Sequence, residues 1–453
     1  MGTPNDALAR LVNEAKCSYA GLARRVNQLG TAEGLTLTYD YTAVGRWVKR
    51  GEQPRSPVPM LLAGALSELL GRTVTPGDLG MTDATTLASR GLDYSADVAV
   101  TVDTILDLGR AELKRRRVIA VPFALAALAA PSRDWLLASL NAIADDRGFR
   151  KVGQAQVDSI RHMFRLFQEL DVMRGGGHAR TALVEYLTGQ VLPLVRRTHE
   201  PVVQTALYEA ASEQTYLVGW MAYDDGQHGL AQRYLIQSLR LAEASGNRAL
   251  GAHVLAGMSD QANLLGHPRE ALALARAGQR GLGSDDSPAC LADLQILEAR
   301  ALAAVGETHA ATRAVTRAEA SFDRVVPENE AEWARFIDAA YLFGEAAHCF
   351  RDLGDTTQIT RFANDSAVEA RRQRRARRGA LSNAVLAIGD IASGEVESAA
   401  ARGIGVVKLA TSVSSSRSRE AVRDLVKRTE PYRTVPLVQE FRREARALLS
   451  TAA

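Results

Sequence analysis

The chain has 453 residues, of which 46% are hydrophobic and 24% are charged, and its formal net charge is +3. This composition excludes a disordered protein and provides for two or three domains, and so small a net charge is no evidence by itself for nucleic-acid binding. Three widely spaced cysteines, Cys17, Cys290 and Cys349, offer neither a disulfide framework nor a zinc site, which favours a reducing, cytoplasmic location.

The composition of nearly every segment predicts an all-α protein. Ala, Leu, Arg, Glu and Gln are abundant, whereas the alternation of Val, Ile and Thr that indicates strands is scarce. The opening segment MGTPNDALARLVNEAK lacks the long apolar stretch of a secretory signal. The run Val118 to Ala130 contains Pro122 and is shorter than the about 20 residues of a membrane span, so we expect a buried helix and no membrane association.

Residues 1–81 are predicted to form a small N-terminal domain of five short helices. Within it, SYAGLARRVNQLG and YTAVGRWVKRGEQP are typical of a helix-turn-helix pair, with Ser18 capping the first helix and Tyr41 to Arg50 forming the second. The second helix would bury Val44 and Trp47. The insert TAEGLTLTYD makes the link between the two helices longer than a tight turn.

This domain resembles the Cro/C1-type DNA-binding domain, in which an apolar anchor, a basic residue, a glycine and a proline follow in that order. Trp47, Arg50, Gly51 and Pro54 carry the resemblance. It implies DNA binding through side chains on the outer faces of the two helices, which would contact phosphates and base edges. The expected DNA-binding residues are Arg24, Arg25, Tyr41, Thr42, Arg46, Lys49 and Arg50.

Residues 82–150 are predicted to be a helical connector, with one long helix from Val98 to Arg117. Residues 151–453 are predicted to form a helical-repeat domain. Helices at about Arg133 to Ile143, Gln154 to Leu170 and Ala179 to Arg197 would lead into the array as a divergent first hairpin or a cap, and two helices in Arg419 to Leu449 would close it.

The array is marked by glycines spaced 40, 40, 48 and 40 residues apart, which we call the ruler glycines: Gly226, Gly266, Gly306, Gly354 and Gly394. Seven residues before each stands a small residue, in order Gly219, Ser259, Ala299, Ala347 and Ala387. Five residues after each comes Ala231, Ala271, Ala311, Ile359 or Ala399. This pattern predicts stacked helical hairpins in which the glycine ends the first helix in a left-handed conformation.

The pattern resembles the tetratricopeptide repeat, whose signature has a small residue, a turn glycine and an alanine at these offsets. The resemblance implies a curved array whose concave face binds a peptide, a small molecule or another protein. Eight additional residues near VVPENEAEW stretch the interval before Gly354, and Ile359 replaces the expected alanine. We expect wider packing there, and a cleft or a hinge.

Most of the chain resembles actinobacterial regulators of the NsdA type, which combine a helix-turn-helix domain with a tetratricopeptide array. The motifs YDYTAVGRWVKRGEQPRSPVP, GRTVTPGDLGM, APSRDWLL and FQELDVMRGGGHARTALVEYL carry this resemblance. It implies a transcriptional regulator of sporulation and antibiotic production.

The motif FQELDVMRGGGHARTALVEYL allows two interpretations. Three glycines expose backbone amides before a helix that begins near His178 and Arg180, and these two side chains could contact an anionic effector. Alternatively, the glycines form a tight corner in which His178 caps the helix, and this interpretation is favoured.

The tract RRQRRARR, from Arg371 to Arg378, allows two interpretations. It could bind phosphate or an acidic partner, or it could be a solvated helix end or an interdomain contact. The second interpretation is favoured. Histidine spacing indicates no metal site, and no nucleophile motif or cofactor motif is present, so we expect no enzyme. The pairs Asp145–Asp146, Asp224–Asp225 and Asp285–Asp286 are predicted to lie in turns and to bond their own backbone.

Two functions remain open at this point. The first is a cytoplasmic, homodimeric DNA-binding regulator whose array binds an effector and sets the geometry of the DNA-binding domain. The second is a protein-interaction scaffold whose N-terminal domain no longer binds DNA, and the long insert before Tyr41 is the feature that favours it.

Overall fold

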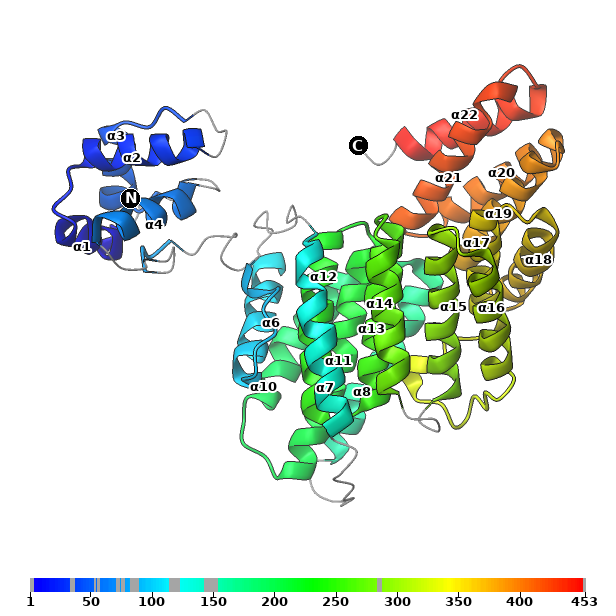
Figure 1. Ribbon diagram of the computed structural model, residues 1–453, viewed down its shortest axis with the longest axis horizontal. Coiled ribbons are helices and arrows are strands. Elements are labelled where there is room, and N and C mark those ends of the chain that lie inside the picture. The colour runs from blue at the N-terminus through cyan, green and yellow to red at the C-terminus, as the bar shows by residue number, and fades with distance from the viewer. Residues whose placement is uncertain are drawn as a thin grey trace. The chain divides into compact units, whose positions relative to one another are not determined.

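The computed structural model describes residues 4–32, 37–52, 54, 58–70, 74, 78–81, 89–113, 123–141, 154–282 and 287–450. Throughout these ranges the regular elements are helices, and no strand is present. The chain divides into two compact units, Met1–Gly91 and Leu92–Ala453 (Figure 1). The all-α prediction is confirmed, as is a small N-terminal domain before a long array of helical hairpins.

The first unit is built on four helices in its described part: α1 (Asp6–Glu14), α2 (Tyr19–Ala32), α3 (Tyr41–Arg50) and α4 (Val58–Leu70). The Oγ of Ser18 accepts a bond from Gly21 N at 3.1 Å, as the sequence predicts for a cap, and Asp40 caps α3 through Ala43 N. Gly51 ends α3 with φ +61°. Val44 and Trp47 are buried in one core with residues of all four helices.

The second unit begins before the array. It contains α6 (Val98–Leu113), the short η2 (Leu125–Ala127) and α7 (Ala129–Asn141), which pack against helices of the array. Trp135 of α7 is 1% exposed because it lies over Gly251 and Gly281, where a Cβ would come within 2.4 Å of its ring atoms. The sequence predicts one buried helix over Val118 to Ala130. From residue 123 on, the structure has instead a short non-helical segment, the 3-10 turn η2 and the start of α7. Residues 114–122 and 142–153 lie outside the described residues.

The helices of the second unit follow one another as hairpins along the array (Figure 1). The leading elements are α8 (Gln154–Arg174), α9 (Gly176–Tyr186), the π-helical η4 (Leu187–Val191) and α10 (Leu192–Val195). The hairpins are α11 (Pro201–Asp224) with α12 (His228–Ser245), α13 (Arg248–Leu264) with α14 (Pro268–Gly281), α15 (Pro288–Ala304) with α16 (Thr308–Phe322), α17 (Ala339–Leu353) with α18 (Thr356–Arg372), and α19 (Ala376–Ala392) with α20 (Val396–Thr411). The closing elements are α21 (Ser416–Arg428), η6 (Glu430–Tyr432) and α22 (Pro436–Ser450).

The ruler glycines occupy the turns that the sequence predicts. Their φ angles lie between +75° and +83°, the left-handed region that side chains with a Cβ disfavour. The small residues seven positions earlier and the residues five positions later are all buried. The repeat is therefore set by close helix packing and by the turn conformation together.

The stretched interval before Gly354 folds into the array. Its residues form the 3-10 turn η5 (Glu332–Ala334), and Trp333 is buried to 2% exposure. Glu330 accepts bonds from Ser287 Oγ at 2.6 Å and Ala289 N at 3.0 Å, so the insert also caps α15.

Ile359, where the repeat pattern predicts an alanine, lies opposite a glycine of a neighbouring helix. It packs on Gly389 of α19, where a Cβ would lie 2.9 Å from the Ile359 Cγ2. A missing side chain on one helix thus makes room for the larger one on its neighbour. None of the described helices is both long and apolar enough to cross a membrane.

Candidate functional site

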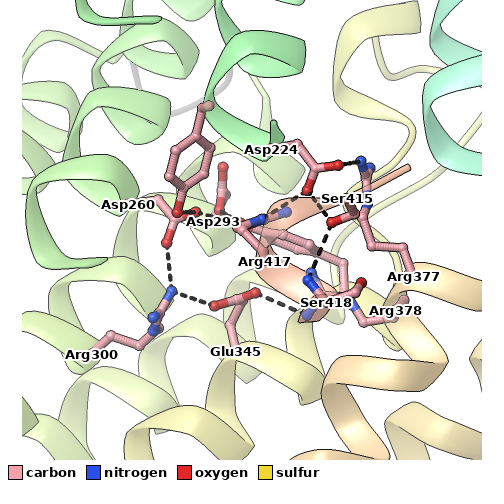
Figure 2. A network of polar contacts seen from close by, with 12 residues as sticks. Asp224, Asp260, Asp293, Arg300, Glu345, Arg377, Arg378, Ser415, Arg417 and Ser418 are labelled. Atoms are coloured by element: carbon pink, nitrogen blue, oxygen red, sulfur yellow. Dashed lines mark hydrogen bonds and ion pairs between the residues drawn. The ribbon is translucent and has the colours of Figure 1, made fainter. Parts of the chain in front are cut away.

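A buried network of acids and arginines joins the first helices of successive hairpins (Figure 2). It extends from Asp171 of α8 and Asp224 of α11, through α13, α15 and α17, to arginines of α19 and α21. A paired charge inside a protein requires good geometry and further hydrogen bonds to offset its loss of hydration. The contacts of its members meet that requirement.

Asp224 is the centre of one half of the network. Its side chain is fully buried, and its two oxygens accept four bonds, from Gly176 N at 3.0 Å, Arg377 Nη1 at 2.8 Å, Ser415 Oγ at 2.9 Å and Arg417 Nε at 3.0 Å. Burial alone would raise the pKa of this carboxyl, but Arg377 and Arg417 outweigh it and lower the pKa to about 2. Asp224 is therefore a tertiary anchor, and its prediction as a turn residue bonding its own backbone is wrong.

The other half of the network is a chain of alternating charges. Arg300 Nη1 lies 2.6 Å from Asp260 Oδ1 and 2.6 Å from Glu345 Oε2, and Glu345 Oε1 accepts from Arg378 at 2.9 Å (Figure 2). Arg417 Nη1 lies 3.4 Å from Asp260 Oδ2 and so links the two halves. Each arginine pairs with carboxylates of helices other than its own, so the network holds several hairpins together.

Asp293 differs from the other acids of this region. Burial and the nearby carboxylates Glu345 and Asp260 raise its pKa to about 8, although the hydroxyl of Tyr341 donates to its Oδ1 at 2.8 Å. Asp293 is therefore largely protonated at neutral pH. A neutral Asp293 relieves the repulsion among three acids that lie close together.

Two hollows flank Arg417 and Leu381. The first, which we call the aromatic cavity, is enclosed by α8, α11, α17, α19, α21 and the insert before α17, and the centre of a water molecule can occupy about 50 Å³ of it. The second is a groove along α13, α15, α17, α19 and α21 in which this volume is about 630 Å³. The groove has an apolar floor that includes Val385 and Ile388 and polar walls that include Asp260, Arg300 and Arg423. Both hollows are lined by residues of the second unit.

The arginine tract divides into an exposed and a buried part. Arg371, Arg372 and Arg374 are exposed, but the side chains of Arg377 and Arg378 are only 10% and 11% exposed and enter the charge network. Arg375 binds both carboxylate oxygens of Asp338 at 2.9 Å. The interpretation of the tract as a solvated helix end thus holds for its first part and is wrong for its second.

The three glycines of the motif before α9 form a packing corner. Gly175 has φ +86°, and a Cβ there would lie 2.4 Å from the carbonyl oxygen of Ser414. A Cβ on Gly176 would lie 2.5 Å from Met221 O, and Gly177 N donates to Ser414 O at 3.2 Å. The corner interpretation holds for the glycines, because two other segments touch this backbone. Its helix cap is wrong: Gly175 is the N-cap of α9 without a side-chain cap bond, and His178 lies within the first turn.

The two predicted effector residues are not brought together around a hollow. His178 is exposed, whereas Arg180 is 9% exposed and is held by Glu112 at 3.2 Å, Gln227 at 3.0 Å and Asp225 at 3.3 Å. Arg180 thus ties α6, α9 and the α11–α12 turn to one another. Neither residue lines the aromatic cavity or the groove.

The predicted DNA-binding residues lie on the outer faces of α2 and α3. Arg24, Arg25, Tyr41, Thr42, Arg46, Lys49 and Arg50 are all exposed, Tyr41 to 62%. The two helices contain five of these cations and no acidic residue. Glu52, just after α3, lies 3.6 Å from Arg46.

The described part of the long insert is held in place by side-chain contacts. Asn27 of α2 bonds the backbone of Tyr39 in both directions, at 2.8 and 3.0 Å, and the Tyr39 ring packs edge-on against Trp47. Thr42 donates its hydroxyl to Asp40 at 2.5 Å, and this bond lowers the pKa of Asp40. Residues 33–36 of the insert lie outside the described residues.

Sequence reasoning missed the charge network, although a signal for it existed. The residues six positions before the ruler glycines are Trp220, Asp260, Arg300, His348 and Ile388, and those thirteen before are Glu213, His253, Asp293, Tyr341 and Leu381. Positions seven apart share a helix face. In the first four repeats both positions are polar or aromatic, which stands out in Ala- and Leu-rich helices, and Asp260 and Arg300 of the network lie there. In the part of the chain that the structure describes, no group of three or more His, Cys, Asp or Glu is placed to hold a metal ion.

Comparison with known proteins gives one match to a family model. Residues 8–82 match the family model of the SP15 N-terminal domain, and this range lies within the first unit, Met1–Gly91. No curated protein matches the chain significantly. The N-terminal segment, which contains most of α1 and the helices α2 to α4, is therefore similar to the SP15 N-terminal domain.

Proposed function

We propose that the protein is a DNA-binding transcriptional regulator, in which the first unit binds DNA and the helical array binds an effector or a partner protein. The observation that carries the proposal is the cationic face on α2 and α3. Five exposed cations and two exposed polar residues lie there on helices without acids, while the opposite faces form the core of the unit. Such separation of charge from core is the footprint of a nucleic-acid-binding domain.

The two helices would have different tasks on DNA. Arg46, Lys49 and Arg50 follow one another along the exposed face of α3, with Tyr41 and Thr42 at its first turn. A helix with this face fits the major groove, where arginine can bind a guanine edge and lysine a phosphate. Arg24 and Arg25 of α2 would contact the flanking phosphates and fix the register.

The array supplies the sensing part of the proposal. Its hairpins enclose an aromatic cavity and a larger groove, and both are lined by side chains from helices far apart in the sequence. A ligand there would contact several repeats at once and so stabilise one arrangement of them. A homodimer is expected because one such domain reads few base pairs, and the NsdA-type resemblance extends the proposal to development and secondary metabolism.

DNA retardation tests the proposal. The full chain is mixed with fragments of its source genome at low salt, and the double variant Arg46→Ala/Lys49→Ala is compared with Arg10→Ala, an exposed arginine on α1 of the same unit. We expect the chain and the Arg10→Ala control to retard a subset of fragments, and the double variant to lose affinity and to show a shallower dependence on salt concentration.

A second outcome would reverse the conclusion. If the full chain retards no fragment at low salt, or if the double variant binds as the control does, the cationic face has no DNA partner. A chain that retards no fragment would be a scaffold that acts through its array. Size-exclusion chromatography with light scattering on the same samples tests the expected homodimer, and a strict monomer on DNA would contradict it.

A further inference from the structure

The aromatic cavity combines ring walls with a charged side, and the rings come from four parts of the chain. Tyr216 and Trp220 of α11 lie next to each other with ring centroids 6.3 Å apart, and Trp220 contacts Phe336 at 6.5 Å. The rings that line the cavity are those of Phe164, Tyr216, Trp220, Phe336 and Tyr341. A wall of rings gathered in this way favours a flat, apolar group lying against it.

The charged side of the cavity is mainly positive. Arg375, Arg377, Arg378 and Arg417 line it, whereas Asp171 is the one acid among the described residues that do so. Asp171 pairs with Arg377, but the partners of Arg375 and Arg378, which are Asp338 and Glu345, are not among the lining residues. The network is thus paired within the protein but presents its cationic side to the cavity.

A cationic ligand does not fit these walls, because the protein's own arginines already cover ring faces. The Arg417 guanidinium carbon lies 5.0 Å from the centroid of Trp220 and 4.8 Å from that of Tyr223, and the Arg378 carbon lies 4.9 Å from that of Tyr341. A second cation would be repelled at close range. An anion gains from the same arrangement, since guanidinium groups bind carboxylates with directed hydrogen bonds.

We propose that the aromatic cavity binds an aromatic carboxylate, with its ring against the wall formed by Trp220 and Phe336 and its carboxylate toward Arg375 and Arg378. The centre of a water molecule can occupy about 50 Å³ of the cavity, and the space open to ligand atoms extends one water radius beyond that volume at every wall. This space suits a single ring with a short acidic arm. The carboxylate could belong to a free acid or to the C-terminal aromatic residue of a peptide. This inference rests on the proposed sensing role of the array and names its ligand.

Binding is tested by isothermal titration calorimetry on the full chain without DNA. The probes are 3-phenylpropionate, its neutral counterpart 3-phenylpropanamide, and the peptide Gly-Gly-Phe with a free or an amidated C-terminus. We expect saturable binding of one carboxylate per chain, with each amide at least about tenfold weaker, since a charged hydrogen bond is lost. Tighter binding of 3-phenylpropionate indicates a free acid as the natural ligand, and tighter binding of the peptide acid indicates a peptide C-terminus.

Two variants and a control locate the site. Arg375→Gln removes a lining cation whose partner Asp338 is 26% exposed and stays hydrated, so folding is expected to persist. Phe336→Leu removes one ring, and Arg371→Gln, exposed in the same arginine tract, is the matched control. We expect about tenfold weaker binding of the acid for Arg375→Gln and for Phe336→Leu, and unchanged binding for the control.

The inference is overturned if neither acid binds, if the amides bind as well as the acids, or if the folded Arg375→Gln and Phe336→Leu variants bind the acid as the control does. DNA retardation is measured separately on the same proteins. Loss of ligand binding with DNA retardation intact therefore refutes this inference alone, whereas ligand binding without DNA retardation refutes only the regulator proposal.

Discussion

Arg377 Nη1 lies 2.8 Å from Asp224 Oδ2, so a residue at the start of α19 is bound to one at the end of α11, 153 positions earlier. The same guanidinium also contacts Asp171 of α8, 2.8 Å from its Nη2. Both acids are buried, and the arginine is their shared counter-charge. The early and late hairpins of the second unit are thus joined directly across its interior, in addition to the contacts between successive hairpins.

Replacing Arg377 with leucine should destabilise the second unit strongly. The change leaves Asp171 without its arginine and Asp224 with Arg417 as its remaining cation, and removing one member of a buried ion pair costs about 3–5 kcal/mol. Urea unfolding followed by circular dichroism measures the loss, with the exposed Arg371→Leu as the control. Equal midpoints for the two variants would show that the buried contacts contribute little.

Replacing Asp293 with asparagine should change how stability depends on pH. The folded carboxyl has a pKa of about 8 against 3.8 ordinarily, so it keeps a proton that the unfolded chain releases. Its contribution to stability is complete below pH 4 and is lost as pH rises toward 8. Asparagine can accept the hydrogen bond from the Tyr341 hydroxyl but does not titrate. The free energy of unfolding of the variant, relative to that of the parent, should therefore rise by about 1–3 kcal/mol between pH 5 and pH 7.5.

Urea unfolding at both pH values provides the measurement for Asp293→Asn. The exposed Asp365→Asn on α18 controls for the general effect of removing a carboxyl. A stability difference between parent and variant that is the same at pH 5 and pH 7.5 would contradict a raised pKa at this site.

The repeat could be predicted from sequence because its cause is local. A glycine such as Gly266 is needed for one turn conformation, and small residues such as Ser259 are needed where two neighbouring helices touch. Both requirements recur at a fixed period. The cap at Ser18 and the buried Trp47 of the first unit were predictable for the same reason, since each depends on residues within a few positions.

The charge network could not be predicted because its contacts join distant segments. Nothing near Arg377 in the sequence indicates that Asp171, 206 positions earlier, will meet it, and an arginine tract is normally solvated. The role of Gly175 was equally hidden, since it depends on Ser414 coming within contact distance. The pairing of Ile359 with Gly389 shows how one departure from a repeat is offset by another, which inspection of single positions does not reveal.

Trp135 should hold α7 on the array. Its ring lies against Gly251 and Gly281, and truncating a buried tryptophan to alanine costs about 3–5 kcal/mol. The Trp135→Ala substitution should release α7 while the hairpins stay folded. Proteases should then cut the variant within residues 129–141, and the variant should keep most of its helix content. Limited proteolysis with mass spectrometry tests this, with Leu264→Ala, 45% exposed, as the control. Cleavage patterns that match the control would show that α7 is held by its other contacts.

Two glycines of the array should respond in opposite directions to the same substitution. Gly306 has φ +83° and Gly405 lies within α20, and an added Cβ meets no atom within 4 Å at either position. Steric contact with neighbours is therefore equal, and the backbone alone decides the sign.

At Gly306, alanine must adopt a left-handed conformation and should destabilise by about 1–2 kcal/mol. At Gly405, alanine limits the freedom of the unfolded chain and suits a helix, and should stabilise by about 0.5–1 kcal/mol. Thermal and urea unfolding of the two variants measure both changes. A gain of stability at Gly306 would show that its turn does not require glycine, and a loss at Gly405 would show that helix propensity does not decide the sign there.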